Sequence, residues 1–254
     1  MLATLKKPLN ATIRFAVGNS VAAKQDRAIN ARRMAELITL RATDPRPLSK
    51  LDYIECGERH DVEPWKLQAV AYQEAPGGSG FDKNGRLMAV PELHQWTKRT
   101  AHAYDKTNPE FFQDGFIHPS KVGKNHPYRI CYNGDRSTAN EARWAEYIGP
   151  MAAIDFDRAL ESTTFGAFQF AGFNWRKLTN PVFDDVFEVV KYLYQSQRSQ
   201  LDIACRLLIA DGGFEPLRAG DYQSFAKVQN GTGRYVAYAA EVKEKADHFR
   251  GQYA

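Results

Sequence analysis

Glu74 is the residue best placed by sequence to act as an acid. It ends a predicted helix over residues 63–75, because the Pro-Gly-Gly of residues 76–78 cannot continue that helix. A carboxylate there faces the negative end of the helix dipole, and the apolar neighbours Val70 and Phe81 would desolvate it; both effects raise its pKa. Such a glutamate suits a general acid near neutral pH. The alternative is an ordinary surface glutamate before a glycine stop.

A second acidic group lies in Val-Pro-Glu-Leu-His-Gln-Trp, residues 90–96. Glu92 and His94 are two residues apart, so in an extended strand both side chains point to the same face. The spacing therefore places both beside a cleft or both in solvent.

Two further segments carry amide side chains that suit a sugar ligand. Residues 162–175 alternate small residues with phenylalanines and predict a tightly packed short helix, in which Gln169 binds a ligand beside aromatic rings such as Phe168. A buried aromatic core segment is the alternative. In residues 229–233 a helix ends on a glycine-rich turn, where Asn230 could present its amide to a sugar or simply follow a helix stop.

Metal and cofactor signatures are missing from the sequence. His118, His126 and Cys131 are near in sequence but match no known ligand spacing. The cysteines Cys56, Cys131 and Cys205 are odd in number and widely spaced, which predicts reduced buried thiols. There is also no phosphate loop, dinucleotide fingerprint or serine nucleophile elbow. We therefore expect no metal and no cofactor.

The elements that must position these residues are mainly helical. Apolar periodicity predicts helices over residues 26–41, 63–75, 142–148, 182–194, 201–211, 222–230 and 234–249, and a helix that starts at Ser49 with Asp52. Between Gly85 and Tyr132 the chain is rich in turns, and Leu87 to Val90 is a strand candidate. The expected fold is mainly α, with a small sheet or hairpin after the helix that carries Glu74.

Charge is distributed unevenly along the 254 residues. Residues 1–50 hold ten Lys and Arg against three Asp and Glu, a net charge of +7, and the remainder carries −3. The prolines at 45 and 47 predict a boundary between a basic arm over residues 1–47 and a main domain over residues 48–254. Such an arm attracts anionic polymers. It lacks the interleaved aromatic residues of a single-strand platform, so we expect no nucleic-acid partner.

The ordered motifs together resemble the N-acetylmuramidase family of phage endolysins and bacterial peptidoglycan hydrolases. The family's Glu-Ser-Gly-Gly-x-Gly-Phe is similar to residues 74–81, its Phe-Glu-Arg-His to residues 91–94, and its Ser-x-Ser-Trp-Gly-Leu-Phe-Gln-Ile-Met-Gly to residues 162–172. Its closing Tyr-Asn-Gly-x-Gly resembles residues 229–233, except that Gln229 stands where the family has an aromatic residue. The resemblance implies a lysozyme-like α+β fold and a possible partial wall-binding module in residues 1–47.

The resemblance implies cleavage of the β-1,4 bond between N-acetylmuramic acid and N-acetylglucosamine in peptidoglycan. Glu74 would protonate the leaving oxygen, and a second carboxylate, Glu92 first and Asp82 behind it, would stabilise or hydrate the oxocarbenium-like transition state. Phe168, Gln169, His94 and Asn230 would line the glycan cleft.

Two other functions remain open on the sequence. One is a lytic transglycosylase, and the other is a non-catalytic wall-binding or virion structural protein. The opening residues have no continuous apolar core for a secretory signal, so we expect the protein to accumulate in the cytoplasm of an infected host. After release it would reach the wall and other anionic envelope polymers. We expect it to be a monomer.

Overall fold

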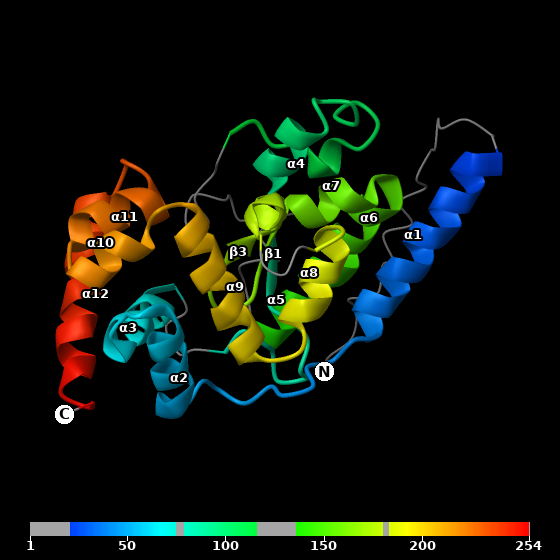
Figure 1. Ribbon diagram of the computed structural model, residues 1–254. Coiled ribbons are helices and arrows are strands. Elements are labelled where there is room, and N and C mark those ends of the chain that lie inside the picture. The colour runs from blue at the N-terminus through cyan, green and yellow to red at the C-terminus, as the bar shows by residue number, and fades with distance from the viewer. Residues whose placement is uncertain (1–20, 75–78, 116–135, 180–182, 254) are drawn as a thin grey trace, which may run out of the picture.

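The computed structural model describes residues 21–74, 79–115, 136–179 and 183–253, and helices make up most of it (Figure 1). The helices are α1 (Val21–Thr39), α2 (Lys50–His60), α3 (Pro64–Glu74), α4 (Leu93–Arg99), α5 (Arg136–Ala142), α6 (Gly149–Ile154), α7 (Phe156–Glu161), α8 (Val186–Leu193), α9 (Gln197–Ala210), α10 (Phe214–Ala219), α11 (Tyr222–Asn230) and α12 (Tyr235–Arg250). Shorter helical segments are η1 (Pro109–Phe111), the π-helical η4 (Arg143–Ile148) and η5 (Gly172–Lys177). The mainly α fold with a minor β region is confirmed.

Local signals placed the helices around Glu74 correctly. The Ser49 side chain accepts a hydrogen bond from the Asp52 amide, and the Asp52 carboxylate accepts one from the Ser49 amide, so this capping box starts α2 as predicted. Pro64 is the first residue of α3, where its missing N–H has no helical partner to lose. Glu74 is the last residue of that helix, and the predicted glycine stop after it lies outside the described residues.

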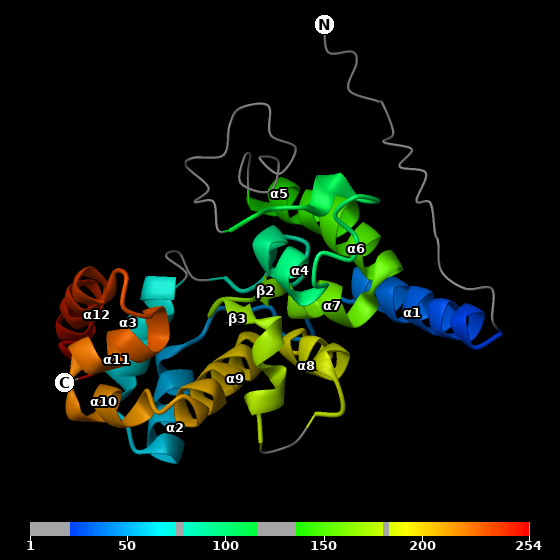
Figure 2. The ribbon, with the colours of Figure 1, turned by 90° about the horizontal axis from the view of Figure 1, so that it is seen from above.

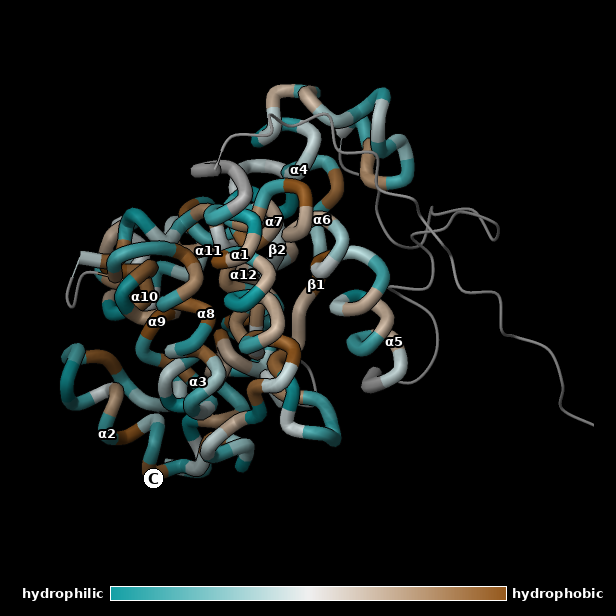
Figure 3. Tube along the Cα trace, turned by 90° about the vertical axis from the view of Figure 1, so that its right-hand side faces the viewer, coloured by the Kyte–Doolittle hydropathy of each residue, from teal (hydrophilic) through white to brown (hydrophobic). Residues whose placement is uncertain are grey.

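Two hydrophobic cores divide the fold. One lies among α1, α4, η4, α6 to α8 and the sheet, around Trp96, Trp144 and Phe156. The other lies among α2, α3 and α10 to α12, around Leu67 and Phe225. Figures 1 and 2 show these two groups of helices on either side of α9. That helix contributes to both cores: Ile203 packs into the first, and Leu201 and Cys205 into the second. In Figure 3 apolar and hydrophilic residues alternate along the helices, as expected where each buries one face.

The sheet is built from segments far apart in the sequence. Strand β1 (Ala89–Pro91) pairs antiparallel with β2 (Thr163–Phe165), and β2 pairs with β3 (Phe170–Ala171). The strand predicted at 87–90 therefore overlaps β1, and the strand with which it pairs, β2, comes from beyond the predicted region of residues 85–132. The short helix predicted for residues 162–175 is wrong over 163–171, because residues 163–165 and 170–171 pair as strands around a turn in which Gly166 and Gln169 have positive φ.

Part of the predicted basic arm packs into the first core. Met34 and Leu37 of α1 are buried there, and the Tyr194 hydroxyl donates a 3.2 Å hydrogen bond to the Leu37 carbonyl. Ile29 and Ile38 of the same helix are 52% and 38% exposed. Within the described ranges, no helix combines the length and apolarity of a bilayer-crossing segment.

Candidate active site

The carboxyl group of Glu74 lies where α3 meets α11, α12 and the turn between β2 and β3. Its Oε1 accepts a 2.5 Å hydrogen bond from the hydroxyl of Tyr238 in α12. A small cavity beside it has a volume of about 20 Å³, room for about one water molecule. Its other lining residues are Val70, Phe168, Phe170, Ala204, Leu207, Leu208 and Gln229. A sugar ring is too large for this cavity.

Burial raises the pKa of Glu74, and it outweighs the hydrogen bonds from Tyr238 and Gln229, which lower that pKa by stabilising the charged form. The direction is the predicted one. Val70 supplies apolar surface to the pocket as expected, whereas Phe81 packs into the first core. The site thus holds a carboxyl that keeps its proton to higher pH than an exposed glutamate does, as a general acid requires.

Tyr238 is a candidate site residue that the sequence reasoning missed, because its hydroxyl contacts Glu74. In the family motif an aromatic residue stands at the position of Gln229, and here a tyrosine from the next helix hydrogen-bonds the glutamate while Gln229 adds a second hydrogen bond. The signal lay in the helix over 234–249, where Tyr238 falls on the apolar face with Val242. A buried tyrosine hydroxyl needs a polar partner, and Glu74 is that partner.

Tyr238→Phe should raise the pKa of Glu74 further and lower stability by about 1 kcal/mol, because it removes a hydrogen bond to the carboxylate. In pH profiles of wall-suspension clearing, the alkaline limb should move to higher pH. Tyr253→Phe is the matched control, since the Tyr253 hydroxyl bonds Gln68 at 2.7 Å, away from Glu74. An unmoved alkaline limb in Tyr238→Phe would contradict the assigned contact.

Glu92 occupies the N-cap position of α4 without a side-chain capping bond, and His94 lies in that helix. The two residues therefore do not share an extended strand as predicted. The two side chains nevertheless face each other, with His94 Nδ1 3.5 Å from Glu92 Oε2. Burial raises the pKa of Glu92 to about 7, and the nearby positive charge of Arg143 opposes that shift. Burial also lowers the pKa of His94, with a smaller contribution from Lys98, so neutral imidazole is favoured. A partly buried carboxyl beside a neutral imidazole can act as a base or a nucleophile.

Asp82, the second choice for this role, is occupied in a tight loop. Its Oδ1 accepts hydrogen bonds from the amides of Asn84 and Arg86, at 2.8 and 3.0 Å, and its Oδ2 accepts one from the Asn140 side chain at 3.0 Å. These contacts are those of a carboxylate that shapes a turn. The geometry favours Glu92 over Asp82 as the second carboxylate.

The turn between β2 and β3 links the two glutamates. The Glu92 amide donates a 2.8 Å hydrogen bond to the Ser162 carbonyl just before β2, while Phe168, in the turn after β2, lines the Glu74 pocket. Gln169 adopts a left-handed φ of 49° and its side-chain amide donates to the Gly166 carbonyl at 3.0 Å, so it holds the turn. Asn230 is exposed at the end of α11.

Gln200 of α9 holds the same turn from the other side. Its buried Oε1 accepts a 2.8 Å hydrogen bond from the Ala167 amide. A Cβ at Gly80 would lie 1.8 Å from that oxygen, and one at Gly166 would lie 2.6 Å from it. The glycines at both positions are therefore needed for close approach to Gln200, and Gly166 also has a φ of 72°.

Comparison with known proteins identifies the family of this chain. The family model described as N-acetylmuramidase matches residues 63–250. The crystal structure of the Burkholderia AP3 phage endolysin is similar, with 28% sequence identity and a TM-score of 0.64, over 82% of this chain and 73% of that chain. A search of curated proteins finds no match. Because the family match spans most of the chain and includes Glu74, Glu92 and Tyr238, the chain belongs to the N-acetylmuramidase family of peptidoglycan hydrolases.

Proposed function

We propose that the chain is an endolysin that cleaves the β-1,4 bond between N-acetylmuramic acid and N-acetylglucosamine, with Glu74 as general acid. The observation that carries the proposal is the Glu74 carboxyl, buried against apolar side chains, hydrogen-bonded to Tyr238 and raised in pKa. In its protonated form this carboxyl can deliver a proton to the glycosidic oxygen as the bond breaks.

Glu92 is the proposed second carboxylate. Once ionised, it would stabilise the oxocarbenium-like transition state directly or would activate a water molecule on the far side of the ring. The Arg143 charge beside it favours the ionised form that both roles need. The β2–β3 turn, with Phe168 and Gln169, would support the glycan between the two acids, while His94 and Asn230 would lie at the edges of the cleft.

Product analysis tests the proposed bond and the use of water together. Purified peptidoglycan is digested with the full-length chain, and the fragments are reduced and examined by mass spectrometry. We expect reducible N-acetylmuramic acid ends that carry the mass of added water. Fragments that end in 1,6-anhydro sugar would instead show a lytic transglycosylase, and the absence of any new ends would show a non-catalytic wall binder.

We also propose that the basic arm draws the protein to anionic envelope polymers. Deleting residues 1–20 removes Lys6, Lys7 and Arg14 but leaves α1 intact, so clearing should weaken at low salt and recover as salt screens the charge. Deleting residues 1–42 also removes the buried side chain of Leu37 and should lower stability at every salt concentration. Clearing rates at low and high salt, with thermal unfolding of both variants, provide the check. An equal loss at all salt concentrations in the shorter deletion would contradict the electrostatic role.

A further inference from the structure

Three side chains of metal-binding types, two cysteines and one histidine, lie together away from the glutamates, where α2 crosses α9. Cys56 and His60 are one turn apart on α2, and Cys205 is on α9. The two sulfur atoms are 3.3 Å apart, and they and a ring nitrogen of His60 all lie within 4.8 Å of one another. Both cysteines are buried and reduced, as predicted. Their convergence, however, was not predicted.

The His60 imidazole has a nitrogen with no use in the fold. Its Nε2 is buried and makes no hydrogen bond, which is unfavourable for a polar atom. A neutral imidazole presents a lone pair at the ring nitrogen that carries no proton. The ring packs on Phe214 with centroids 5.4 Å apart, which fixes its plane. A bound cation would satisfy this orphaned nitrogen.

Two arginines are neighbours of the cluster. Arg59 stands beside His60 on α2, and Arg206 stands beside Cys205 on α9. Asp202 partly neutralises the arginines, because its Oδ2 lies 2.7 Å from Arg206 and its Oδ1 lies 3.8 Å from Arg59. Two thiolates and a dication in this setting would leave little net charge to bury.

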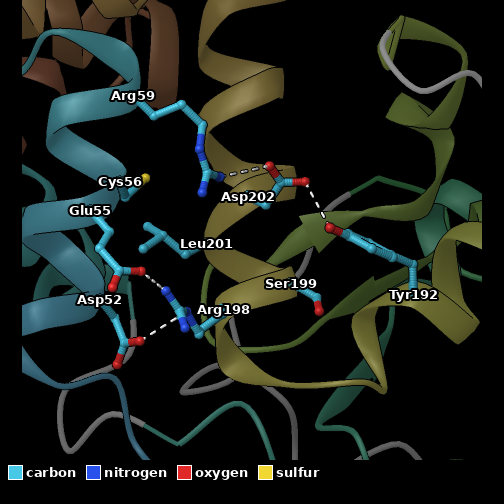
Figure 4. Close-up of a pocket in the computed structure, with 9 residues that line it drawn as sticks. All are labelled: Asp52, Glu55, Cys56, Arg59, Tyr192, Arg198, Ser199, Leu201 and Asp202. Atoms are coloured by element: carbon cyan, nitrogen blue, oxygen red, sulfur yellow. Dashed lines mark hydrogen bonds and ion pairs between the residues drawn. The ribbon is translucent and has the colours of Figure 1, made fainter.

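Cys56 of the cluster also borders a pocket. Figure 4 shows Cys56 on the wall of a pocket between α2 and α9, with its sulfur directed toward α9. The pocket has a volume of about 200 Å³ and is lined further by Asp52, Glu55, Arg59, Tyr192, Arg198, Ser199, Leu201 and Asp202. An ion could enter through it, and water in it could serve as a further ligand.

We propose that Cys56, His60 and Cys205 bind a thiophilic metal ion, Zn²⁺, which links α2 to α9. Two thiolates and an imidazole are ligands that Zn²⁺ prefers over Mg²⁺ or Ca²⁺. With Zn–S bonds of about 2.3 Å in tetrahedral geometry, the sulfurs would separate to roughly 3.8 Å, a small movement from their present contact. Binding would release the two thiol protons. Sequence spacing could not reveal the site, because Cys56 and Cys205 are 149 residues apart.

The test uses the full-length chain, purified under a thiol-free reductant and stripped with a chelator. After addition of Zn²⁺ and gel filtration, elemental analysis should find one zinc per chain, and the thermal unfolding temperature should rise. Mg²⁺ should produce neither effect. Co²⁺ in place of Zn²⁺ should give thiolate-to-cobalt charge-transfer absorption in the near ultraviolet and the visible bands of a tetrahedral site. Retention of no zinc, or cobalt spectra without thiolate bands, would overturn the proposal.

Single variants locate the site. Cys56→Ser, Cys205→Ser and His60→Ala should each lose stoichiometric zinc and the zinc-dependent rise in unfolding temperature, while Cys131→Ser, the matched control, should keep both. Circular dichroism checks that each variant is folded, and the cobalt spectrum of the unaltered chain decides the matter where a variant fails to fold. Zinc retained by all three variants, or lost equally in Cys131→Ser, would overturn the assignment. So would finding that Cys56 and Cys205 form a disulfide even under the reductant.

Discussion

Glu74→Gln is expected to lower the rate of wall clearing by about 10³-fold, within the range that general acid catalysis contributes. Glutamine keeps the shape of the carboxyl and can still accept the hydrogen bond from Tyr238, but it has no proton to give to the leaving oxygen. Binding of the variant to purified wall should be unchanged, since the cleft keeps its form. Turbidity of wall suspensions measures clearing, and co-sedimentation measures binding.

The matched control for this variant is Glu241→Gln. Glu241 lies on α12 close to Tyr238, but its carboxylate accepts a hydrogen bond from Gln73 at 2.5 Å and does not line the Glu74 pocket. Its loss should leave clearing within about twofold of the unaltered chain, as expected for a residue away from the chemistry. Unchanged clearing in Glu74→Gln would refute the proposed acid, and equal loss in both variants would point to a fault in folding.

Glu92→Gln should abolish most activity and at the same time stabilise the fold. Activity needs ionised Glu92, so in the unaltered chain it should fall as the pH drops below about 7. Stability has the opposite dependence, because the folded chain holds this proton more tightly than the unfolded chain does. Between the ordinary pKa of 4.5 and about 7, stability therefore decreases as the pH rises.

The size of this stabilisation follows from the pKa. A shift from 4.5 to about 7 corresponds to about 3 kcal/mol at pH 8, which the neutral glutamine recovers. At pH 4 the variant and the unaltered chain should be equally stable. Urea unfolding at both pH values measures the difference, and Glu146→Gln, at an exposed position in η4, is the control. Equal stability of Glu92→Gln and the unaltered chain at pH 8 would contradict the raised pKa of Glu92. Full activity of the variant would contradict the proposed role of Glu92 as the second carboxylate.

Local signals in the sequence determined the helices around the site. Ser49 with Asp52 started α2, Pro64 started α3 and Glu74 ended it, because caps and prolines act on the backbone within a few residues. The same reasoning correctly predicted a raised pKa for Glu74 from its place at a helix end among apolar residues. It failed for residues 163–171, where pairing with β1 selected the strand form.

Only the tertiary structure decided which groups meet across the fold. Tyr238 reaches Glu74 over 164 residues, and Cys205 reaches Cys56 over 149. Asp82, the second choice after Glu92 in the sequence, is held by its own loop. These pairings depend on how the two cores pack against α9, and packing is set by the sum of many weak contacts that no short pattern encodes. The sequence therefore singled out Glu74 as the candidate acid, and the packing decided which side chains it contacts.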